Sequence, residues 1–232
     1  MFPACCIRRI VCSVAVAALL AACSAGAAER LSEKTKPESG FIPDYSLLQK
    51  VPKVEGPRGT QLYRYRKPGV SPASYQAVII DPVVLNQAQP EGDLSADVLE
   101  QTRAALERSI RAAVAARPAR IVTEPGPGVL RLSIAISGAD IETEGFKPRN
   151  LLPISAVIKL ATRATDTEAK TPTLLVESKL VDSASQELIG AGMITVAGES
   201  FRQQANTAPA FQALTQRIVD IAVQTAASGA AK

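Results

Sequence analysis

The chain has 232 residues, of which 47% are hydrophobic, 21% charged and only 4% aromatic, and it contains four Cys but no His or Trp. This is enough apolar material for one medium-sized domain, since a chain of this length buries roughly 70% of its unfolded surface. The absence of His excludes Ser-His-Asp and Cys-His nucleophiles, His-ligated zinc and haem, and a His-based pH switch. The sequence predicts no catalytic residue, no metal site and no cofactor.

The amino terminus has the shape of a secretory signal peptide. Arg8 and Arg9 form a basic region, and residues 10–22 are a short apolar run that ends in small residues. A run of about a dozen residues is too short for a permanent transmembrane helix, which needs roughly 20. We therefore expect this segment to direct export and then to be removed.

The apolar run ends in Leu-Ala-Ala-Cys at residues 20–23, a tetrapeptide that resembles a bacterial lipobox. The resemblance implies cleavage between Ala22 and Cys23, a diacylglycerol thioether on Cys23 and acylation, as by palmitate, of the new amino terminus. Several acyl chains on one residue anchor a protein stably, whereas a single chain gives only marginal affinity. The alternative is an ordinary signal peptide followed by a coincidental cysteine.

The residue after Cys23 bears on the destination of the protein. Gram-negative lipoproteins that stay in the inner membrane usually carry Asp at this position, whereas this chain has Ser24. We therefore expect a lipid-anchored outer-membrane protein that faces the periplasm. Removal of residues 1–22 leaves 24 basic against 22 acidic residues, a balance too near neutral to indicate nucleic-acid binding.

The composition divides the chain into four parts. Residues 1–22 are the expected signal peptide, and residues 23–39 are the lipidated flexible tether, rich in Ala, Ser, Glu and Lys. Residues 40–228 form a single periplasmic domain, and the last residues, 229–232, are a disordered tail. The other cysteines all lie within the signal peptide, so the domain has no disulfide and depends on its core alone.

The domain begins with a short segment that combines turn formers with large hydrophobic side chains, Ser-Gly-Phe-Ile-Pro-Asp-Tyr-Ser-Leu-Leu at 39–48. We expect it to pack on the domain as a strap. With the lipobox, the polar tether and the later Ile80-Asp81-Pro82, it resembles the bacterial lipoproteins catalogued as domain of unknown function 3313. The matching motif residues are Ser39, Gly40, Phe41, Asp44, Tyr45 and Ser46.

The resemblance extends to Leu180-Val181-Asp182-Ser183 and Gln186-Glu187-Leu188, where the family tends to have an Asp-Ser-x-Thr-Gly-Glu turn between two strands. Ala184 and Ser185 replace part of that turn here. The resemblance covers most of the mature chain and implies a location and a fold, but no activity.

Residues 61–67 alternate rings with guanidinium groups, which is a strand pattern. One interpretation is a basic and aromatic surface for a partner, formed by Tyr63, Arg64, Tyr65 and Arg66. The other is an edge strand with its rings on the core and its charges in water.

The remaining pattern predicts an α+β fold. Strands are expected at 77–84, with a break at Asp81-Pro82, and at 120–124, 129–139, 174–181 and 188–196. Helices are expected at 95–116, capped by Ser95, and at 211–225; residues 154–165 are ambiguous, with a weak preference for strand. The consistent architecture is a two-layer sandwich, a mixed sheet of about four to five strands with two amphipathic helices on one face.

The sequence leaves three classes of function open. The first is a non-catalytic interaction or structural module of the envelope, anchored in the membrane through Cys23 and contacting an envelope protein or a glycan. The second is a periplasmic hydrolase that uses the carboxylates Glu142 and Glu144 or a Ser155–Lys159 pair. The third is a carrier of apolar ligands, which requires a cavity that no sequence pattern shows. The sequence does not predict the oligomeric state.

Overall fold

A computed structural model describes residues 39–52, 54, 60–71, 74–86, 94–143, 169–203 and 206–228, with the side chains of residues 142, 143, 227 and 228 left out. The signal peptide, the tether and Cys23 lie outside these residues, as do residues 154–165. Within the described part of the chain, no helix is long and apolar enough to cross a membrane.

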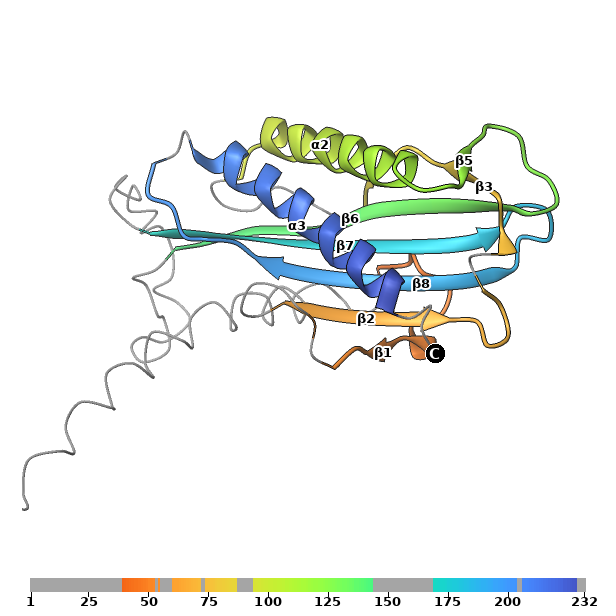
Figure 1. Cartoon of the computed structure of the whole chain (residues 1–232). Helices are drawn as coiled ribbons and strands as arrows, with labels where there is room; N and C mark the ends of the chain where they lie inside the picture. The colour runs from red at the N-terminus through yellow and green to blue at the C-terminus, as the bar shows by residue number, and fades with distance from the viewer. Residues whose placement is uncertain are drawn as a thin grey trace, which may run out of the picture.

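The structure is a mixed sheet with two long helices (Figure 1). Its elements in chain order are the 3-10 turn η1 (Tyr45–Leu47), β1 (Gln49–Lys50), β2 (Gln61–Arg66), β3 (Ala77–Ile80), β4 (Val84–Leu85), α2 (Ala96–Ala115), β5 (Arg120–Ile121), β6 (Val129–Thr143), β7 (Lys170–Asp182), β8 (Leu188–Ala197) and α3 (Thr207–Ser228). The α+β class and the strands and helices expected within the described residues are confirmed.

The sheet contains eight strands, so the expected number of four to five was wrong. Their order is β1-β2-β8-β7-β6-β3-β5, and β4 also pairs with β6. The short strands β3, β4 and β5 run parallel to their neighbours, whereas the long strands β6, β7 and β8 pair antiparallel. The difference arises partly from the two-residue strands β1 and β4, which show too little alternation to be recognised as separate strands in a sequence.

The helix α2 forms where the sequence predicts it. The side chain of Ser95 accepts a hydrogen bond from the N–H of Val98 at 3.3 Å and so caps the first turn. Its buried side chains, Leu99, Thr102, Ala105, Leu106 and Ile110, follow a helical spacing. Figure 1 shows α2 and α3 on the same side of the sheet, and Phe211 and Leu214 of α3 join Leu106 in one core cluster with the strands.

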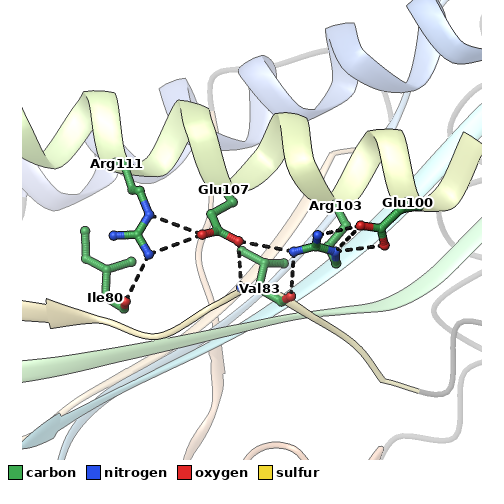
Figure 2. A network of polar contacts seen from close by, with 6 residues as sticks. All are labelled: Ile80, Val83, Glu100, Arg103, Glu107 and Arg111. Carbon is green, nitrogen blue, oxygen red and sulfur yellow. Dashed lines mark hydrogen bonds and ion pairs between the residues drawn. The ribbon is translucent and has the colours of Figure 1, made fainter.

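Side chains of α2 satisfy the backbone at the break between β3 and β4 (Figure 2). Arg103 Nη1 donates to the carbonyl of Val83 at 3.3 Å, and the N–H of Val83 donates to Glu107 at 3.4 Å. One turn further along, Arg111 Nη2 donates to the carbonyl of Ile80 at 3.3 Å. Glu107 also lies 3.2 Å from each of the two guanidinium groups. The strand can therefore break without leaving these backbone groups unpaired.

The strand β2 corrects one expectation. It lies between β1 and β8 and is not an edge strand. Leu62 belongs to the core cluster under the helices, and Arg64 Nη1 donates to the carbonyl of Thr225 in α3 at 2.9 Å. The Arg side chain therefore shares the helix side of the sheet, and the rings of Tyr63 and Tyr65, which alternate with it, face the other side. Burial lowers the pKa of Arg64, and the neighbouring Arg66 lowers it further.

Candidate functional site: a strap held on a buried carboxylate

Among the described residues, one carboxylate is buried, and it lies on the side of the sheet opposite the helices. Glu177 lies in the middle of β7 with 1% of its surface exposed. Leu174 and Val176 of the same strand belong to the core cluster that includes residues of both helices. Because side chains alternate along a strand, Glu177 faces the other side. A charge in such a position is costly unless hydrogen bonds satisfy it.

Three hydroxyl groups satisfy this carboxylate. Ser39 Oγ and Ser137 Oγ both donate to Oε2 of Glu177 in short hydrogen bonds, and the hydroxyl of Tyr45 donates to Oε1 at 2.8 Å. The hydroxyl oxygens of Ser39 and Tyr45 are themselves 2.7 Å apart. All four side chains therefore form one connected group in which donors from distant parts of the chain meet one acceptor.

An irregularity in β6 brings Ser137 to this side. The register pairs Ile136 with Val176 and then Gly138 with Leu175, so that Ser137 is an additional residue in its strand. A β-bulge of this kind re-aims one side chain. The hydroxyl of Ser137, which is 2% exposed, consequently points at the carboxylate.

The strap, residues 39–48, supplies the other two donors and is ordered by its own hydrogen bonds. The side chain of Asp44 caps η1 by accepting from the N–H of Ser46 at 2.9 Å. The N–H of Ile42 donates to the hydroxyl oxygen of Tyr45 at 3.2 Å, and the Ile42 side chain is 2% exposed. Gly40 has a φ of +80°, which favours glycine. The motif residues of the strap thus shape the turn and place its phenol.

Two further residues hold the first residues of the strap. Asn86 Nδ2 donates to Ser39 Oγ at 3.2 Å and to the Ser39 carbonyl at 3.4 Å. Lys179 Nζ donates to the carbonyl of Phe41 at 3.3 Å and lies 4.7 Å from the centre of the Phe41 ring, within the range of a cation–π contact. In Figure 1 the orange segment before β1 passes behind the sheet, away from the helices.

The electrostatics of the group favour a protonated phenol. Burial raises the pKa of Tyr45, and Glu177 raises it further, whereas hydrogen bonds with Ser39 and the N–H of Ile42 lower it. The hydroxyl therefore keeps its proton and donates a hydrogen bond to the carboxylate. This arrangement fastens the strap to the sheet, since each member either donates to or accepts from another member of the same group.

The second part of the family motif forms the turn between β7 and β8. Asp182 Oδ1 accepts from the N–H of Ser185 at 2.8 Å and of Ala184 at 3.0 Å. The backbone N–H of Ser185 is the main cause of the lowered pKa of Asp182. Ser183, which is 4% exposed, accepts from the N–H of Gly126 at 3.0 Å and so joins this turn to the one before β6.

The structure does not test the expected catalytic candidates. Glu144, Ser155 and Lys159 lie outside the described residues, and Glu142 is placed only by its backbone, opposite Thr171 in the pairing of β6 with β7. Among the described residues, no three His, Cys, Asp or Glu side chains gather in a way that suits a metal ion.

Sequence reasoning found the strap but not its partners on the sheet. Glu177 and Lys179 were expected only as part of a strand, and Ser137 and Asn86 were not singled out. The available signal was one acidic residue directly after the apolar run Leu174–Val176. A charge at that place in an otherwise buried strand indicates a partner elsewhere in the chain.

Comparisons with known proteins identify relatives of this chain. The sequence profile of the protein family of unknown function DUF3313 matches residues 37–225. The uncharacterized lipoprotein YdcL of Escherichia coli K12 is 25% identical over 198 residues, which cover 85% of this chain and 86% of YdcL.

Two solved structures are similar at lower identity. A PelC dodecamer from Paraburkholderia phytofirmans is 12% identical with a TM-score of 0.37, covering 69% of this chain and 96% of that one. Protein XCC0632 from Xanthomonas campestris is 16% identical with a TM-score of 0.36, covering 68% of this chain and 90% of the other.

Proposed function

Since the chain belongs to the DUF3313 family of proteins of unknown function, we propose that it is a lipid-anchored, non-catalytic module of the bacterial envelope. In this proposal Cys23 carries the acyl chains, residues 23–39 are the tether, and the domain projects from the outer membrane into the periplasm. There it contacts an envelope protein or a glycan. The relative named as a lipoprotein, YdcL, supports the anchored location.

The observation that carries the proposal is the fastening of the strap to Glu177. The strap is the first described part of the chain, and it begins at Ser39, the last residue of the expected tether. Any pull on the tether reaches the domain at Ser39, whose side chain and carbonyl are held by Glu177 and Asn86. Such an attachment suits a domain that must stay folded and oriented on a membrane.

The test of anchoring compares variants of the full chain produced in a Gram-negative host. Cys23→Ala is expected to abolish incorporation of an alkyne-labelled palmitate and to move the protein from the membrane pellet to the periplasmic extract. Cys12→Ala is the matched control, because that cysteine lies in the segment expected to be removed, and it should change neither readout. A Cys23→Ala protein that remains in the pellet after a high-salt wash would refute lipid anchoring.

The outer-membrane destination has a separate test. Ser24→Asp is expected to shift the anchored protein to the inner-membrane fraction of a sucrose gradient, whereas Ser24→Ala leaves it in the outer-membrane fraction. If both variants sediment with the inner membrane, as does the wild type, the proposed location is wrong while the lipid anchor stands.

A further inference from the structure

A groove of about 580 Å³ lies between α2 and α3, on the outer side of the helices. Figure 1 shows the two helices diverging toward their carboxyl ends, which opens this space. Apolar side chains from both helices line it, including Ala113 and Val219, and Arg108, Arg117 and Asp220 lie along its walls. Arg108, Arg117 and Asp220 are exposed, so the groove is open to solvent.

The charges of α2 differ between its two sides. On the side that faces β3 and β4, Arg103 and Arg111 form ion pairs with Glu107, and Arg103 also pairs with Glu100. On the groove side, no carboxylate of the described residues lies within ion-pair distance of Arg108 or Arg117.

Other polar side chains of the groove form hydrogen bonds within the molecule. Asp220, the one carboxylate among the lining side chains, accepts from Gln216 at 2.9 Å. Gln216 in turn accepts from Ser109 at 3.2 Å, and this contact bridges the two helices. Arg117 makes only a long contact, 3.5 Å, with the carbonyl of Val223. The groove therefore presents two guanidinium groups and one carboxylate beside an apolar floor, and neither guanidinium forms an ion pair with that carboxylate.

The charge of the groove narrows its occupant, an argument that rests on the proposed function. In the periplasm the domain would meet segments of other envelope proteins. Because neither Arg108 nor Arg117 pairs with a carboxylate of the described residues, an acidic segment complements the groove better than a neutral or basic one.

We propose that the groove between α2 and α3 binds an acidic segment of another envelope protein. The segment carries a carboxylate for each of Arg108 and Arg117 and small apolar side chains between them, which pack on the alanines of α2. Charge-assisted hydrogen bonds with the two guanidinium groups supply orientation and specificity.

The experiment uses photo-crosslinking by the full-length, anchored protein in its own cells. A photoreactive residue at Ala112, in the groove, is compared with one at Ala222, an exposed position of α3 outside the groove. The Ala112 probe is expected to yield an adduct whose crosslinked peptide, identified by mass spectrometry, is acidic. Combining the probe with Arg108→Glu and Arg117→Glu should reduce that adduct at least tenfold. Arg120→Glu, an exposed residue of β5 that does not line the groove, is the matched control and should leave the adduct unchanged.

The outcomes separate this inference from the proposed function. Loss of the protein from the membrane pellet refutes the anchored location. If the protein is anchored but its Ala112 probe captures lipid, a second copy of the chain or nothing, this inference is wrong and the proposed location stands. The same holds if its adduct is equally strong after both charge reversals.

Discussion

Glu177 is the residue on which the strap depends. Replacement by Leu leaves the hydroxyls of Ser39, Ser137 and Tyr45 without their acceptor in a buried place, and each unsatisfied group costs roughly 1–3 kcal/mol. We expect Glu177→Leu to lower the free energy of unfolding by about 3 kcal/mol or more, measured by urea denaturation. Glu199→Gln, at an exposed ion pair with Arg217, is the control and should change nothing measurable. Equal stability of both variants would contradict the fastening role of Glu177.

Tyr45 gives this fastening a pH dependence. Its pKa is raised above the ordinary value of 10.0, chiefly by burial, so the folded state favours the neutral phenol. The stabilisation from this group is fully present below pH 10 and is lost as the pH rises through the raised pKa. We therefore expect Tyr45→Phe to be less stable than the wild type by about 1–2 kcal/mol at pH 8, and the difference to shrink in denaturation measurements carried to pH 11.5. A difference that stays constant up to that pH would show that the phenol does not titrate in this way.

At the scale of elements, local patterns predicted more than long-range contacts. The helix α2, its Ser95 cap and the break at Asp81-Pro82 follow from spacing and from backbone rules that act over a few residues. The partners of the strap do not, because Glu177 is 138 residues away from Ser39 and Ser137 reaches it only through a bulge. The number of strands was underestimated for a related reason, since β1 and β4 are two residues long and exist only as pairings with longer strands.

Just beyond the end of β8, at Gly198, the backbone lies close to β7 and α3. A Cβ atom at Gly198 would lie 2.9 Å from Cγ of Pro172 and 3.2 Å from Cδ2 of Leu214. Gly198→Ala must displace the proline ring or the leucine, and overpacking of this kind typically costs about 1–3 kcal/mol. We expect a corresponding loss in the free energy of unfolding. Gly126→Ala is the matched control, since nothing lies within 4 Å of its Cβ position; a loss that is as large in the control would assign the effect to backbone freedom and not to packing.

At the scale of the whole molecule, the two sides of the sheet are stabilised by different means. On the helix side, apolar side chains of α2 and α3 pack on the strands in one core cluster. On the other side, the strap is held by hydroxyl groups, a carboxylate and a lysine. The first side contributes most of the apolar burial that stabilises the fold, and the second determines where the strap joins the sheet. The strands β6 and β7 take part in both.

This division predicts that substitutions on the two sides act independently. Leu214→Ala creates a cavity under α3 and should cost about 3 kcal/mol, while Tyr45→Phe loosens the strap. Their effects on the free energy of unfolding should add to within about 0.5 kcal/mol, because the two side chains share no partner. Tyr45→Phe and Ser39→Ala, whose hydroxyls both donate to Glu177, should instead be clearly non-additive. If the first pair couples as strongly as the second, the helices and the strap stabilise the sheet as one unit, and a pull on the tether would reach the groove between α2 and α3.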